Sequence, residues 1–162
     1  MPSPTGYSRA QISIHWIMAI LILTMFFSGE IIHDFSHLLE RQPGAQPPVG
    51  VLAHIVAGIA ILALALWRIS LRVRRGAPEE PEGIPAMQAL AAKLVHLTLY
   101  AVMVMMPVSG LVAWFGGVHA AGEAHGVMKA VLIVLLVLHI GAALYHQYVL
   151  KNGLIRRMMK AE

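Results

Sequence analysis

Long apolar runs, separated by short stretches rich in proline, glycine or charge, dominate this chain. Each run supplies the roughly 20 mostly apolar residues that a helix needs to cross a bilayer. The four runs lie at about residues 10–32, 49–71, 87–115 and 123–150. Prolines interrupt the connections at 31–48 and 72–85, and glycines bound the turn at 116–122, as expected where helices end. The pattern predicts an all-α integral membrane four-helix bundle, formed by residues 1–162 as one domain.

The composition agrees with a membrane environment. Of the 162 residues, 58% are hydrophobic and only 12% are charged, whereas about 25% of residues are charged in a typical soluble domain. The chain contains no cysteine, which excludes disulfides, iron–sulfur clusters, thiolate metal sites and the covalent attachment of c-type haem. Any haem must therefore be bound non-covalently.

The positive charge is distributed as a topology signal. A net charge of +4 would by itself suit a nucleic-acid partner, but the cations gather on one side of the predicted bundle. That side holds Arg9, Arg68, Arg72, Arg74, Arg75, Lys93, Lys151, Arg156, Arg157 and Lys160, and only Arg41 and Lys129 lie opposite. By the positive-inside rule both termini are expected in the cytoplasm. Membrane lipid, and no nucleic acid, is the expected surrounding partner.

Histidine is the chemically informative residue, with nine in so apolar a chain. Ionisable side chains at membrane depth are costly and are functional candidates by default. His125 and His139 are fourteen residues apart on one predicted helix, which places them within about 40° of the same face and about 21 Å apart. This spacing suits two stacked haems, each held by imidazoles from two facing helices.

Depth in the membrane predicts the partners of these two histidines. His54 and His125 both lie just inside the outer ends of their spans, and His15 matches His139 toward the inner side. A single intramembrane histidine is as often a hydrogen-bonding residue between helices. Four histidines with paired depths favour two haems with bis-histidine ligation over structural roles or another metal.

The remaining histidines are less defined. His96 enters the third span from the inner side and either rivals His139 for the inner iron or bonds a haem propionate or a quinone carbonyl; we favour the second reading on its helix position. The role of His146 stays open. His33, His37 and His119 are expected on the outer surface.

Arginines and glycines offer further candidate contacts. Arg9, Arg68 and Arg72 are placed to bind haem propionates, because the guanidinium fork matches a carboxylate. Enforcing topology and binding lipid headgroups explain each of them equally well. Gly58, Gly110 and Gly141 would admit a porphyrin plane, although ordinary small-residue helix packing is at least as good an account.

Several of these residues belong to recognisable motifs. They are Tyr7-Ser-Arg-Ala-Gln-Ile-Ser-Ile-His15-Trp16, Ala53-His54, Trp67-Arg68, His96-Leu-Thr-Leu-Tyr100, Pro107-Val-Ser-Gly110 and Leu138-His139. With this set, residues 7–158 resemble the bacterial cytochrome b561 family. The resemblance implies two haem b groups in a multi-pass protein of the bacterial inner membrane. His15 and His139 would ligate the cytoplasmic-side iron, and His54 and His125 the periplasmic-side iron.

The resemblance also implies two kinds of function. Some members of the family are superoxide oxidases that reduce ubiquinone, and others carry electrons for a separate dehydrogenase or periplasmic redox partner. We expect the first, although the short outer loops offer few cations beyond Arg41 and Lys129 to attract superoxide. A proton-coupled transporter ranks a distant third, because Glu30 and Glu123 lie near the outer ends and the spans contain no central carboxylate.

Overall fold

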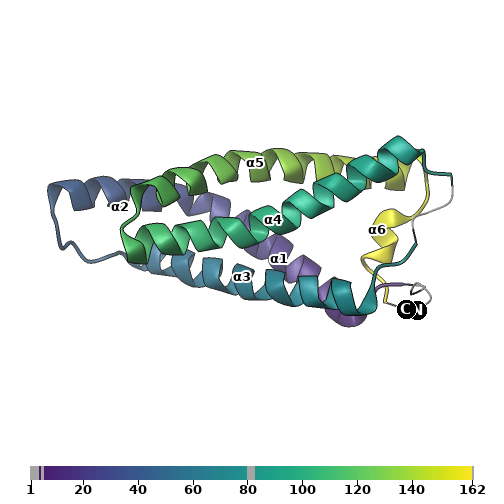
Figure 1. Cartoon of the computed structure of the whole chain (residues 1–162), viewed down its shortest axis with the longest axis horizontal. Coiled ribbons are helices and arrows are strands. Elements are labelled where there is room, and N and C mark those ends of the chain that lie inside the picture. Colours follow the sequence, from purple (N-terminus) through teal and green to yellow (C-terminus); the bar gives the residue numbers. More distant parts are fainter. Residues whose placement is uncertain (1–3, 5, 80–82, 162) are drawn as a thin grey trace.

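The computed structural model describes residue 4 and residues 6–79 and 83–161, and every regular element in this part of the chain is helical. The elements in chain order are α1 (Arg9–Phe27), α2 (Gly29–Arg41), α3 (Val49–Arg75), α4 (Ala86–Gly116), α5 (His119–Leu144), the π-helix η1 (Tyr145–Val149) and α6 (Leu154–Arg157). Figure 1 shows α1, α3, α4 and α5 running along the molecule. The short α2 lies at one end, and α6 lies at the other end near the start of α1.

Four helices are long and apolar enough to cross a membrane: α1, α3, α4 and the segment His119–Val149, which continues α5 through η1. Most of their apolar side chains are exposed on the outside of the bundle, as expected where lipid tails are the solvent. The predicted all-α architecture with four candidate spans is therefore confirmed. The orientation of the termini stays a prediction.

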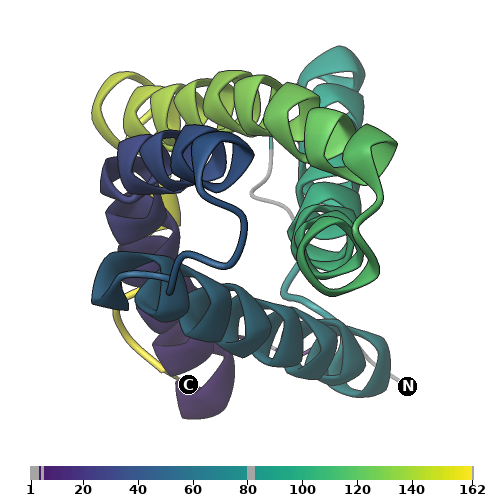
Figure 2. The ribbon, with the colours of Figure 1, turned by 90° about the vertical axis from the view of Figure 1, so that its left-hand side faces the viewer.

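A narrow apolar core holds the four helices together. It is built from Ile14, Met18 and Ile22 of α1, Ile61 and Ala65 of α3, Leu99 and Val102 of α4, and Leu132 and Leu135 of α5. Helix α4 packs against both α3 and α5, and α1 packs against α3. Figure 2 shows the same order end-on, with α3 and α5 on opposite sides.

The first predicted span is wrong at its outer end. It was expected to continue to residue 32, but α1 ends at Phe27, and residues 29–41 of the predicted connection form the separate helix α2. At the junction the Ser28 hydroxyl donates to the Met25 carbonyl, 2.8 Å away. Helix α2 exposes its charged residues and buries only Phe35. Such an amphipathic segment belongs at an interface rather than in hydrocarbon.

Two other predicted boundaries move by a few residues. Helix α3 continues past residue 71 and ends at Arg75. The next residue, Gly76, caps it with a φ of 75°, which suits glycine. The turn expected at 116–122 is only two residues long, because α4 ends at Gly116 and α5 begins at His119. Within the connection expected at 72–85, residues 80–82 lie outside the described residues.

Hydrogen bonds from side chains close the end of the bundle that carries α6. The Trp16 indole N–H donates to the Met158 carbonyl at 2.7 Å, and Arg157 donates to the Glu79 carbonyl at 2.7 Å. Gln11, which is buried, donates to the Gly76 carbonyl at 3.1 Å. These contacts join the start of α1 to the end of α3 and to the α6 segment.

Candidate haem sites

His54 of α3 and His125 of α5, which we call the outer pair, face one another near the α2 end of the bundle. Their ring centroids are 6.2 Å apart, with an angle of 60° between the ring planes. Both side chains are half-buried. The structure thus brings together the two histidines that were predicted to share the outer haem.

Hydrogen bonds orient both rings of the outer pair. His125 donates from Nδ1 to the carbonyl oxygen of Met106, 2.8 Å away, and a carbonyl can only accept. His54 Nδ1 lies 2.7 Å from the hydroxyl oxygen of Ser28. Because that hydroxyl already donates to Met25, its oxygen accepts the His54 proton. Each ring therefore keeps the lone pair of Nε2 for a metal, as in histidines with an orienting second partner.

Gly110 makes room for His125. A Cβ added at Gly110 would stand 3.1 Å from both Cε1 and Nδ1 of the His125 ring, which is closer than ordinary van der Waals contact. The glycine lies in α4, directly after Ser109 and three residues after Pro107. Its role is to let the ring approach the α4 backbone and reach the Met106 carbonyl.

His15 of α1 and His139 of α5, which we call the inner pair, face one another nearer the α6 end. Their ring centroids are 6.1 Å apart with an interplanar angle of 69°. His96 of α4 is exposed, and its ring centroid lies 5.2 Å from that of His139. Trp16 packs edge-on beside His15 at 5.3 Å.

Both pairs have the spacing that one iron requires. With an iron–nitrogen bond of about 2.0 Å and about 1.1 Å from nitrogen to ring centre, two imidazoles on opposite sides of one iron would place their centroids about 6.2 Å apart. The distances of 6.1 and 6.2 Å match this value, whereas the 5.2 Å between His96 and His139 is too short. The geometry favours His15 over His96 as the partner of His139.

The backbones that carry these histidines also stand apart. Among the described residues, no Cα of α5 comes within 8 Å of a Cα of α1 or α3, although α5 supplies one member of each pair. The long helix that packs directly against α5 is α4. Imidazoles that meet across separated backbones, with Nε2 free in the outer pair, fit a haem b held between helices.

The three predicted propionate arginines lie in different surroundings. Arg68 donates to the Gln11 carbonyl at 3.1 Å, lies 6.0 Å from the centre of the Tyr100 ring, and is within electrostatic range of both inner histidines. Arg9 and Arg72 are exposed. Arg72 borders an open apolar groove of about 300 Å³ between α3 and α4, which Tyr100 also lines.

The structure places His146 apart from both pairs. It lies in the π-helix η1, and the side-chain amide of Asn152 donates to its Nδ1 at 2.7 Å. The ring proton of neutral His146 is then on Nε2, so this nitrogen is not available to a metal. His33, His37 and His119 are exposed. Gly58 and Gly141 face no histidine ring, since an added Cβ would meet only Met25 or nothing.

Sequence reasoning missed the residues that orient the ligands. Neither the Ser28 hydroxyl nor the Met106 carbonyl was expected to bond a histidine, and Asn152 was not considered. Only two weak signals were available: a serine near the end of the first apolar run, and Pro107 inside the third. Neither signal identifies which histidine is the partner.

The fold and the paired histidines define a class: a protein with four helices suited to cross a membrane and two pairs of facing imidazoles with the spacing of metal ligands. Comparison with known families agrees, because residues 6–161 match the family model described as prokaryotic cytochrome b561. The chain belongs to the prokaryotic cytochrome b561 family. It is a membrane cytochrome that carries electrons, and the family implies haem b.

Individual relatives match over nearly the whole chain. A cytochrome b562 of Cereibacter sphaeroides is 37% identical and covers 99% of both sequences. A protein named probable superoxide oxidase CybB of Yersinia pestis is 29% identical over 94% of this chain and 95% of its own length. Cytochrome b561 homolog 1 of Escherichia coli is 27% identical, covering 94% of this chain and 96% of its own.

Proposed function

We propose that this chain holds two haem b groups and moves electrons from superoxide at the periplasmic surface to ubiquinone. His54 and His125 bind the outer haem iron, and His15 and His139 bind the inner one. The observation that carries the proposal is the two pairs of facing histidines. The ring centroids are 6.2 Å apart within the outer pair and 6.1 Å apart within the inner pair, and α5 supplies one histidine to each. The relative named probable superoxide oxidase supports the choice of electron donor.

The histidines and their partners perform the protein's share of this chemistry. When bound, haem b supplies one-electron oxidation and reduction at its iron. Ser28 and the Met106 carbonyl hold the outer imidazoles by Nδ1, which fixes their direction and basicity. In the net reaction two superoxide anions each lose one electron and leave as dioxygen. Ubiquinone gains both electrons and two protons from the cytoplasm.

The inner side offers a place for the acceptor. His96 is exposed while its ring touches that of His139, so a quinone carbonyl that accepts a hydrogen bond from His96 would lie within electron-transfer range of the inner pair. The apolar groove between α3 and α4, lined by Tyr100 and Arg72, opens on the same half of the bundle and suits an isoprenoid quinone. Arg68 is placed for a propionate of the inner haem.

A second function is favoured by the charge of α2. This outer helix carries Glu30, Asp34 and Glu40 against the single cation Arg41, and such a surface repels an anion such as superoxide. A cationic periplasmic redox protein would instead be attracted. In that case the chain serves as an electron-carrying subunit for a separate protein, without substrate chemistry of its own.

Haem content across histidine variants tests the ligand assignment. Replacing His54 or His125 by Ala should remove the outer haem, and replacing His15 or His139 should remove the inner one, because each low-spin iron needs both imidazoles. His96→Ala and His146→Ala should keep both haems. The measurement is the haem-to-protein ratio with redox titration of each purified variant. Loss of the inner haem in His96→Ala, with His15→Ala retaining it, would overturn the inner pair.

Kinetics with the purified protein then distinguish the two functions. Wild-type protein supplied with superoxide and a soluble ubiquinone should form ubiquinol without any other protein. His54→Ala should abolish this activity, because electrons then have no outer entry point. The carrier function would be established instead if wild-type protein with both haems is not reduced by superoxide, yet is reduced when a cationic periplasmic redox protein is added.

A further inference from the structure

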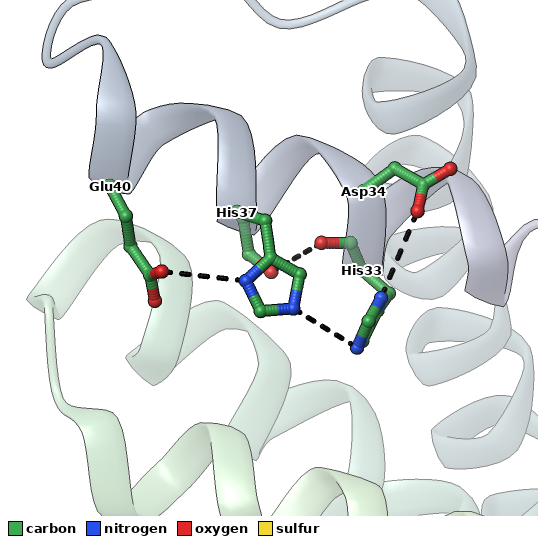
Figure 3. A network of polar contacts seen from close by, with 5 residues as sticks. His33, Asp34, His37 and Glu40 are labelled. Carbon is green, nitrogen blue, oxygen red and sulfur yellow. Dashed lines mark hydrogen bonds and ion pairs between the residues drawn. The ribbon is translucent and has the colours of Figure 1, made fainter.

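Helix α2 carries a second arrangement of histidines, separate from both haem pairs. His33 and His37 are one helical turn apart, and their side chains are 71% and 55% exposed. Their Nε2 atoms are 3.3 Å apart, within hydrogen-bond distance; the dashed line between the two rings in Figure 3 marks this contact. The two ring centroids are 4.5 Å apart, far closer than in either haem pair.

A carboxylate lies at the other nitrogen of each ring. Glu40 Oε2 is 3.4 Å from Nδ1 of His37, and Asp34 Oδ1 is 3.8 Å from Nδ1 of His33 (Figure 3). The Glu40 carboxylate can accept a hydrogen bond from Nδ1 of His37, whereas Asp34 is too distant for one and favours a proton on Nδ1 of His33 through its charge alone. In the neutral pair one Nε2 donates to the other across this distance, and a ring whose proton moves to Nδ1 frees its Nε2 lone pair for a metal. A cation bound by both Nε2 atoms would replace that hydrogen bond.

The separation of the two nitrogens indicates which cation fits. With metal–nitrogen bonds of about 2.0–2.1 Å, neighbouring ligands are about 3.3 Å apart in a tetrahedral site and about 2.9 Å apart in a square-planar one. Ligands on opposite sides of a metal are about 4.1 Å apart. The observed 3.3 Å is the tetrahedral separation, the geometry that Zn²⁺ adopts in proteins.

We propose that His33 and His37 bind one Zn²⁺ through their Nε2 atoms on the outer surface of α2. Asp34 and Glu40 orient the rings and, with Glu30, give the helix the negative charge that a divalent cation requires. Among the described residues, no three metal-binding side chains gather in one place. Water therefore completes the remaining two positions, and the bound zinc is exchangeable.

Zinc titration of the haem-loaded, detergent-purified chain tests this site. The wild-type protein should bind one equivalent of Zn²⁺ by isothermal titration calorimetry. His33→Gln and His37→Gln should each weaken binding by at least about 10-fold, the low end of what is lost even when only an orienting partner of a metal ligand is removed. His119→Gln is the matched control and should bind as the wild type does. His119 is likewise exposed beside a carboxylate, 3.6 Å from Glu123, but contacts no second histidine among the described residues.

Haem content shows that each variant is folded, since α2 contributes no ligand to the proposed haem sites. Co²⁺ in place of zinc should give the intense visible absorption of tetrahedral coordination in the wild-type protein and lose it in His37→Gln. Equal zinc affinity in the wild type and the His33→Gln/His37→Gln double variant would overturn the proposal. Half an equivalent of zinc per chain would also overturn it, because the ligands would then come from two copies.

Discussion

The Nδ1 hydrogen bonds of the outer pair differ in kind, and this difference has measurable consequences. His125 bonds a main-chain carbonyl, which no substitution at Met106 removes, whereas His54 depends on the side chain of Ser28. Ser109 also lies 3.5 Å from His125 Nδ1, at the limit of a hydrogen bond. The orientation of His54 is therefore the more vulnerable of the two.

Ser28→Ala should weaken binding of the outer haem by about 10-fold or more, the size of effect seen when a metal-binding histidine loses its orienting partner. The inner haem should be unaffected. Ser109→Ala is the control, because His125 keeps the Met106 carbonyl. Competition of each variant with a haem-binding apoprotein measures the loss, and equal outer-haem affinities in the two variants would contradict the role given to Ser28.

Gly110→Ala should shift the midpoint potential and the electron paramagnetic resonance signal of the outer haem. The added Cβ would stand 3.1 Å from the His125 ring, which must move by a few tenths of an ångström. Gly141→Ala adds the same methyl group to α5 where nothing lies within 4 Å, so both haem signals should stay as in the wild type. A shift confined to the inner haem in Gly110→Ala would refute this reading.

At the scale of elements, hydropathy predicted the spans well and α2 badly. The bilayer requires about 20 apolar residues whatever the tertiary contacts are, so four runs were visible in the sequence. Only Ser28 separates α2 from the end of α1, and Ile31 and Ile32 in the first turn of α2 extend the apolar run. The break at Ser28 depends on local hydrogen bonds that hydropathy does not record.

Phe35 anchors α2 to the bundle. Its ring is 4% exposed and lies 6.0 Å from that of Trp114. Phe35→Ala should detach α2, because removing a buried phenylalanine costs about 3–5 kcal/mol, and amide hydrogen exchange along residues 29–41 should accelerate. Leu38→Ala, at a position that is 39% exposed, should leave the exchange nearly unchanged. Equal exchange in both variants would show that α2 is held by other contacts.

For the whole molecule, depth along the helices predicted the level at which histidines meet, but left His96 as a rival for a place at the inner level. Rise per residue matches His54 with His125 and His15 with His139, because each imidazole must lie at the level of its partner. Helix rotation was not predictable in the same way. How α4 is turned about its axis decides where the His96 ring lies, and its centroid is 5.2 Å from that of His139, against 6.1 Å for His15.

The start of α1 and α6 share one end of the bundle (Figure 1), and the arginines at 74, 75, 156 and 157 gather there. We therefore expect both termini in the cytoplasm. A fluorescent protein that folds only in the cytoplasm should fluoresce when fused after residue 162 and stay dark when inserted at residues 43–46, between α2 and α3. The opposite result would invert the assignment of outer and inner haem.

The closure of the α6 end also bears on how the protein is assembled during synthesis. His15 enters the membrane with the first helix, but His139, which faces it, is made only with the last span. The carbonyl of Met158 that accepts from Trp16 is made later still. In the proposed ligand scheme, the inner haem can be captured only after translation is nearly finished. The ribosome-bound chain already contains His54 and Ser28, so the outer cofactor lacks only the early turns of α5. Cofactor loading is thus expected to proceed from the outer side to the inner.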